Sequence, residues 1–204
     1  MADYIAPADV MAALAIAETD DPTLNQAVSA ASNLVRDMCG RDFGTVASSA
    51  RFFHPLDGYC CPIDDATTVT VVATDDAGDG LYSTIWAAAD WQATPVGNIG
   101  PAGQTGWPYT AIVAIESRSF TTDLNLRPTV KVTAVWGWGA IPAPIKQATL
   151  FVASEMFKAA REAPFGSANL ADFGPVLIRG NRRVDQLLAP YKTMAASDGR
   201  FLVA

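Results

Sequence analysis

Few side chains in this 204-residue sequence could carry out chemistry. His54 is the only histidine, and the three cysteines are Cys39, Cys60 and Cys61. Any Ser-His-Asp or Cys-His site would have to use His54. That residue follows two phenylalanines in a predicted strand, which favours a packed or surface histidine. No G-x-S-x-G segment occurs, so the sequence predicts no catalytic residue and no enzymatic activity.

The same residues make a poor metal site. Cys60 and Cys61 are adjacent, so their side chains point in different directions, and the spacing of structural zinc ligands is absent. An odd number of cysteines is also a poor disulfide framework and favours reduced, packed thiols. We therefore predict no metal and no cofactor.

An acidic, glycine-containing turn has some features of a calcium loop. Asp75 could be position 1 and Asp79 position 5. Ala77, however, stands at position 3, and Trp86 stands at position 12, where a bidentate Glu is needed. A solvated hairpin turn is favoured, and a weak ion site stays open.

Two further residue sets could suggest a ligand site. Regularly spaced glycines are not followed by the Lys-Ser/Thr pair of a phosphate-binding loop. They are therefore expected to provide flexibility to a loop at residues 94–108 and not to bind phosphate. Tryptophans could form a carbohydrate or peptide platform, but core or interface positions are favoured. The glycines are Gly97, Gly100, Gly103 and Gly106; the tryptophans are Trp86, Trp91, Trp107, Trp136 and Trp138.

The charge is unevenly distributed. Residues 1–100 carry 14 acidic and 3 basic side chains, whereas residues 101–204 carry 7 and 11, for a net charge of −7. A chain this acidic is not expected to bind DNA generally, because it has no excess of cations to replace phosphate counterions. The asymmetry suits contact between copies or a basic arm on an acidic partner, and ordinary variation along a surface stays open. The longest apolar runs are too short to span a bilayer, and no secretory signal is evident.

Periodicity predicts an α+β fold. Asp21-Pro22 gives an N-cap and a proline at N1, a helical stripe follows, and Gly40 ends it. β-Branched residues with a period of two predict a small antiparallel sheet, and a long apolar helix follows it. We expect an N-terminal helical hairpin and a long central helix packed with this sheet, then an extended C-terminal arm ending in a short helix. The boundaries are a core at 1–163, with helices at 7–18, 22–39 and 144–162 and strands within 50–136, and an arm at 164–204.

Several short segments, in order along nearly the whole chain, resemble the head-to-tail connector (adaptor) family of long-tailed bacteriophages. The helix ending with Gly40, Arg41 and Phe43 is similar to the family's "GR-x-F" segment. A strand that begins Arg51-Phe52-Phe53 follows. The segment Trp136-Gly137-Trp138 is similar to the family's "V-x-Y/W-G-W" ending, which precedes a proline-started, alanine-rich helix. Tyr191-Lys192 in the last helix matches in kind.

The resemblance implies a structural virion protein and not an enzyme. It implies a homo-oligomeric ring, dodecameric to match the portal, that lies beneath the portal protein in the virion neck and extends the DNA channel to a downstream neck or tail protein. DNA would pass through without specific binding during genome ejection, assembly would take place in the host cytoplasm, and no membrane is involved.

Two residue sets follow as candidate sites. Relatives dock through terminal segments that become ordered on assembly, and the arm here combines apolar anchors with cations. The expected portal-docking residues are Val176, Leu177, Ile178, Arg179, Arg182 and Arg183. Acids of the N-terminal half could line the channel and repel phosphate, and outer-surface positions stay open for them. These are Asp20, Asp21 and Asp37.

Two other functions stay open. The chain could be a tail-completion or stopper subunit of the phage neck, which would not bind the portal directly. A small enzyme or ligand-binding domain is less favoured because of the single histidine and the lack of paired site residues.

Overall fold

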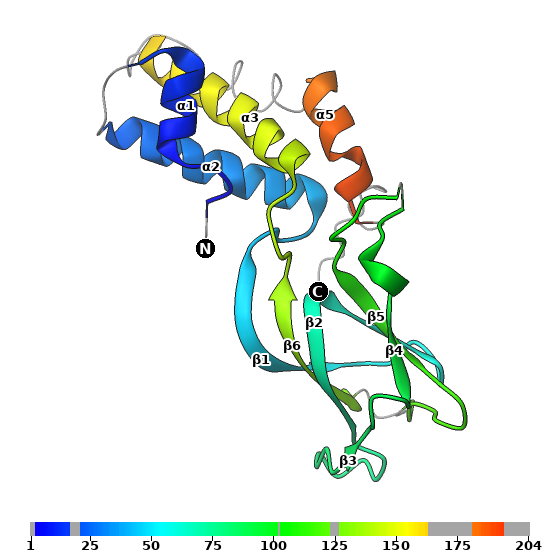
Figure 1. The fold of residues 1–204 in the computed structure, drawn as a ribbon. Helices are drawn as coiled ribbons and strands as arrows, with labels where there is room; N and C mark the ends of the chain where they lie inside the picture. The colour runs from blue at the N-terminus through cyan, green and yellow to red at the C-terminus, as the bar shows by residue number, and fades with distance from the viewer. Residues whose placement is uncertain (1–2, 17–20, 102, 123–126, 163–180, 194–204) are drawn as a thin grey trace. The chain divides into compact units, whose positions relative to one another are not determined.

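The computed structural model describes residues 3–16, 21–101, 103–122, 127–162 and 181–193. The chain divides into a helical unit, formed by residues 1–43 and 141–204, and a β unit, formed by residues 44–140. Each unit is coloured along the chain in Figure 1. The α+β class predicted from periodicity is confirmed, because helices and an antiparallel sheet are both present.

The helical unit is built around α3. This helix packs against α1, α2 and α5. Its apolar stripe supplies buried Ile145, Ala148, Val152 and Phe157, as its sequence pattern predicted. The helices are α1 (Pro7–Leu14), α2 (Pro22–Cys39), α3 (Ala143–Glu162) and α5 (Arg182–Leu188), followed by the 3-10 helix η2 (Ala189–Tyr191).

The ends of α2 follow the predicted local chemistry. The Asp21 side chain accepts a hydrogen bond from the Thr23 backbone N–H at 2.8 Å, and Gly40 takes the left-handed conformation at φ 65°. The end predicted for the first helix, residue 18, is wrong. Ala15 adopts φ 53°, and its backbone N–H bonds back to the helix, so α1 ends at Leu14. No glycine occupies this position, so no local stop signal predicted the end of α1 there.

The β unit is a six-stranded sheet in which every neighbouring pair is antiparallel. The order is β1-β6-β2-β5-β4, with β3 paired to the end of β2. The strands are β1 (Thr45–Phe53), β2 (Cys60–Thr74), β3 (Thr84–Ile85), β4 (Trp91–Thr94), β5 (Tyr109–Ala114) and β6 (Val130–Gly137), with a 3-10 turn η1 (Val96–Asn98) after β4.

Strand β2 holds the sheet together. Its first half pairs with β5 and its second half with β6, and register shifts occur near Ala66 and Val69. Such irregularities bend a strand, which lets one strand serve two neighbours. The sheet extends beyond the predicted limits of 50 and 136, because β1 begins at Thr45 and β6 ends at Gly137.

The predicted domain boundary stays a prediction. Residues 163–180, where the core was expected to give way to the arm, lie outside the described residues. The short last helix predicted for the arm is present as α5, and Val184 and Leu188 on it are buried.

Gly137 is a position where only glycine fits. Its φ is +91°, and a Cβ added there would lie 1.8 Å from the carbonyl oxygen of Gly44. A side chain at residue 137 is therefore disfavoured twice, by the positive φ and by the lack of space for its Cβ. The β1 and β6 backbones meet here, since Thr45 is the register partner of Gly137.

We predict that Gly137→Ala lowers the free energy of unfolding by roughly 3–5 kcal/mol, since it adds a backbone clash to left-handed strain. The measurement is chemical denaturation followed by tryptophan fluorescence. Gly78→Ala is the matched control: φ is +70° there, but a Cβ would meet nothing within 4 Å. The control should lose only about 1–2 kcal/mol, and equal losses for the two variants would contradict the role given to the Gly44 carbonyl.

Candidate functional site

The described thiols are poorly suited to nucleophilic chemistry. Cys39 and Cys61 are buried, Cys60 is half-buried, and all three are free. Burial raises the pKa of Cys39 to about 12 and, with a smaller effect of neighbouring Cys60, raises that of Cys61 to about 12. Both buried thiols are therefore protonated at neutral pH, and a protonated thiol is a weak nucleophile and ligand.

His54 lies on the surface just beyond β1. Among the residues that the structure describes, no group of three or more His, Cys, Asp or Glu side chains could hold a metal ion. None of the described helices combines the length and apolar composition that crossing a bilayer needs.

The acidic turn uses its first aspartate to fix its own backbone. Asp75 is 2% exposed, and its two carboxylate oxygens accept hydrogen bonds from the backbone N–H groups of Asp79 (3.2 Å) and Gly80 (2.8 Å). Burial by itself would raise the pKa of Asp75, but the hydrogen bonds from this backbone outweigh it and lower the pKa. This is the hairpin turn that the sequence favoured, closed by an ionised aspartate.

In the helical unit, the "GR-x-F" residues close the end of α2. Gly40 turns the chain, Arg41 follows it half-buried, and Phe43 is fully buried. The Phe43 ring packs edge-on against Tyr4 at 5.6 Å and against Tyr191 at 6.0 Å between ring centroids. One aromatic residue thus joins the start of the chain, the end of α2 and the end of η2.

A polar network surrounds this aromatic cluster. The Tyr4 hydroxyl donates to the Asp42 carboxylate at 3.0 Å and accepts from the Phe43 backbone N–H at 3.2 Å. Arg36 lies 3.4 Å from the same carboxylate. Burial raises the pKa of Tyr4 to about 12, and the Asp42 charge adds to this effect. Thr193 donates its backbone N–H to the Cys39 carbonyl at 2.9 Å, which satisfies one of the last carbonyls of α2.

In the β unit, the other two motif segments come together. Trp136 is 1% exposed, and its indole N–H donates to the Ser49 carbonyl at 2.9 Å. The guanidinium carbon of Arg51 lies 4.5 Å from the Trp136 ring centroid, and Phe53 packs on the same ring at 5.5 Å. Arg51 also pairs with Asp64 at 2.6 Å. The "RFF" strand and the "WGW" strand are therefore neighbours that share one aromatic core.

Trp138 is anchored on several sides. Its indole N–H donates to Asp65 at 2.9 Å, its ring meets Trp107 edge-on at 4.8 Å, and its carbonyl accepts a hydrogen bond from the Thr45 hydroxyl. Four of the five tryptophans are buried in the β unit, which confirms the expectation that they serve the core: Trp86, Trp107, Trp136 and Trp138.

The candidate docking and channel residues are only partly described. Val176, Leu177, Ile178, Arg179 and Asp20 lie outside the described residues.

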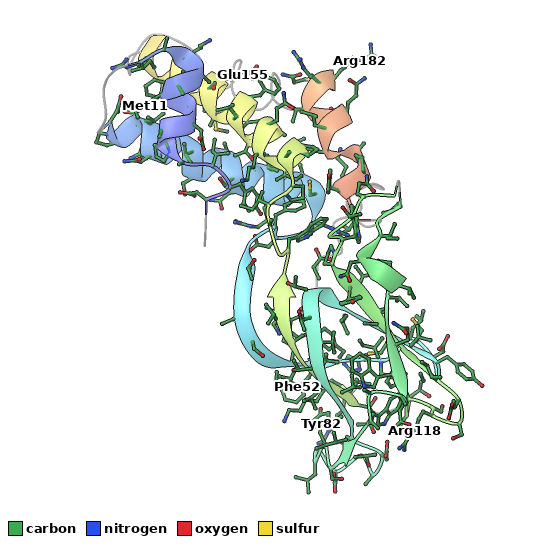
Figure 2. The ribbon with its side chains drawn as sticks, viewed as in Figure 1. Met11, Phe52, Tyr82, Arg118, Glu155 and Arg182 are labelled. Carbon is green, nitrogen blue, oxygen red and sulfur yellow. The ribbon has the colours of Figure 1, made fainter. Side chains whose placement is uncertain are left out.

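The remaining candidates lie on α5 and α2. Arg182, labelled in Figure 2, is exposed in the first turn of α5. Arg183 is exposed in the same turn, and its guanidinium lies 5.2 Å from the Phe151 ring. Asp37 is exposed on α2. Asp21 caps α2 and lies 3.8 Å from Arg161, so it has a structural role in the helical unit.

Sequence reasoning missed Tyr4 and Asp65 as members of these clusters. Tyr4 lies before the first predicted helix, and Asp65 carries no sequence signal that links it to Trp138. Only a long-range contact identifies the role of each residue.

The comparisons with known proteins show the fold. No protein-family model and no curated protein matches the chain. Among solved structures, the chain is similar to one described as "Neck of empty GTA particle computed with C6 symmetry", with a TM-score of 0.53 and 17% identity over 98% of this chain and 93% of that chain.

Two further structures match with lower scores. They are "Neck of native GTA particle computed with C12 symmetry" (TM-score 0.48, 17% identity, 100% of this chain and 97% of that chain) and "Virion of native gene transfer agent (GTA) particle" (TM-score 0.47, 19% identity, 98% and 93%).

We predict that Tyr4→Phe lowers the free energy of unfolding by about 1–2 kcal/mol at neutral pH, because the Phe43 N–H and Asp42 lose a partner. In the wild type, the pKa in the folded state exceeds the ordinary value of 10.0. The stabilising effect of neutral Tyr4 is therefore complete below pH 10 and is lost as the pH rises through 12. The measurement is denaturation of both proteins from pH 8 to 12. A difference between wild type and variant that did not shrink over this range would contradict the assignment.

Proposed function

We propose that this protein is a head-to-tail connector of a phage-like particle, a structural protein and not an enzyme. It forms a ring beneath the portal protein in the virion neck, and the number of subunits that we favour is twelve. There it extends the DNA channel to a downstream neck or tail protein. Assembly takes place in the host cytoplasm, and DNA passes without specific binding during ejection.

One observation carries this proposal: the fold matches a chain from a particle neck over 98% of this sequence and 93% of the other. A match over nearly the full length of both chains includes the helical unit and the β unit, and is therefore more than a shared local motif.

The side chains support the same conclusion. The segments that resemble the connector family pack into two structural clusters, one around Phe43 and one around Trp136. Within the described residues, the buried thiols are protonated and His54 is on the surface, so these groups offer no activated nucleophile.

The portal contact is assigned to the arm residues 176–179 together with Arg182 and Arg183. Arg182 and Arg183 project from α5, so they are available to an acidic partner. Deleting the whole segment from 176 onward would also remove Val184 and Leu188 from the core. Substitution separates docking from folding better than truncation does.

We predict that the quadruple variant Leu177→Asp, Arg179→Glu, Arg182→Glu and Arg183→Glu binds its cognate portal ring at least about 100-fold more weakly, as expected when apolar anchors and charge pairs are lost together. Binding is measured by co-sedimentation of full-length protein with purified portal rings. Lys158→Glu, a single charge reversal of the same sign on an exposed position of α3, should bind normally. Wild-type protein that fails to bind portal would favour the stopper or tail-completion alternative instead.

The channel-lining role is tested at Asp37, because Asp21 is needed as a helix cap. If Asp37 faces the lumen, Asp37→Lys introduces a cation beside passing phosphates and slows DNA ejection severalfold, more strongly at low salt. Ejection is followed by DNA release from particles assembled with the variant. Asp37→Asn, which removes the charge without reversing it, should have a smaller effect. Unchanged kinetics for the Lys variant would place Asp37 outside the channel.

A further inference from the structure

The sheet of the β unit ends in two open edges. Strand β1 lies at one end of the strand order and β4 at the other, as Figure 1 shows. Within the described part of the chain, β1 pairs only with β6, and β4 pairs only with β5. Each therefore presents a row of backbone N–H and C=O groups that can pair with another extended strand.

The first six residues of β1 carry neither a charge nor a proline, two common protections against such pairing. These residues, 45–50, are all exposed. The register shift between Val46 and Ser49 places Ala47 and Ser48 opposite one residue of β6 and bends the edge, but it adds no charge. The charged residue of the strand, Arg51, follows this stretch and pairs with Asp64. We expect residues 45–50 to be the part of β1 that accepts another strand.

The edge at β4 has matching chemistry. No charged residue occurs between Trp91 and Ile115, although the whole chain has 14 basic and 21 acidic side chains. Val96 and Ile99, just beyond β4, are 65% and 51% exposed, and Val46 on β1 is 46% exposed.

We infer that β1 of one copy of this chain pairs with β4 of the next copy. This contact rests on the proposed ring and names the surfaces that build it. An open edge recognises only extended backbone, and the uncharged stretch 45–50 of β1 can meet the uncharged β4 without burying an unpaired charge. The two edges differ, so the contact is head-to-tail and repeats from copy to copy instead of ending at a dimer.

A disulfide scan tests the contact directly. Facing residues on paired strands have Cα atoms about 4.5–5.5 Å apart, within the range of a disulfide. In full-length protein carrying Cys60→Ser, cysteines are placed at Ser48 or Ala50 and, on the other edge, at Gln92 or Thr94. At least one double variant should form a ladder of covalent multimers after mild oxidation, and the single variants should not.

A charge variant tests the contact without cross-linking. Ser48→Lys should weaken self-association at least tenfold in sedimentation velocity experiments, while Ser48→Thr, uncharged at the same position, should behave as wild type. Both are measured alone and with portal rings, and circular dichroism checks that both are folded. Should Ser48→Lys prove unfolded, the disulfide scan alone decides.

The outcomes separate this contact from the proposed function. Wild-type protein that never self-associates, even with portal, overturns both the ring and the contact. Wild-type rings that persist in Ser48→Lys, with no ladder from any double variant, overturn the contact alone. A covalent dimer from a single variant at Ser48 or Ala50 would mean that two β1 strands face each other, which also overturns it.

Discussion

The close approach of two backbones at Gly137 is the constraint on which the β unit depends. The carbonyl of Gly44 occupies the space where a Cβ of residue 137 would be. This contact holds the first residue of β1 beside the last residue of β6, so the chain enters and leaves the sheet at neighbouring points. Trp136 and Trp138 flank the glycine, and both are buried. A position that only glycine can occupy therefore lies between two of the largest core side chains of the unit.

The segments that resemble the connector family lie beside the two places where the chain passes between its units. The Phe43 cluster closes the helical unit just before residue 44, and the Trp136–Trp138 segment closes the sheet just before residue 140. Each segment has aromatic packing partners, as scaffold residues require. Their chemistry is that of aromatic contacts and fixed backbone turns.

The acidic residues of the N-terminal half fall into two groups. Some accept hydrogen bonds that fix the backbone, such as Asp21 at the α2 cap and Asp75 in its turn. Others are exposed, such as Asp37. On the sheet, residues 45–50 of β1 and the residues of β4 carry no charge.

The sequence by itself determined the elements with strong local signals. Asp21-Pro22 and Gly40 defined α2, the apolar stripe defined α3, and β-branched runs located most of β2 and β6, because capping, periodicity and φ preferences act over a few residues. Nothing local indicated that α1 ends at Leu14, or that β1 begins at Thr45, where side chains are exposed and do not alternate. The tertiary structure alone decided that Phe43 meets Tyr4 and Tyr191, and that Arg51 covers Trp136. These depend on contacts between residues far apart in the chain, which no short pattern encodes, since register and packing are fixed only when the whole unit is assembled.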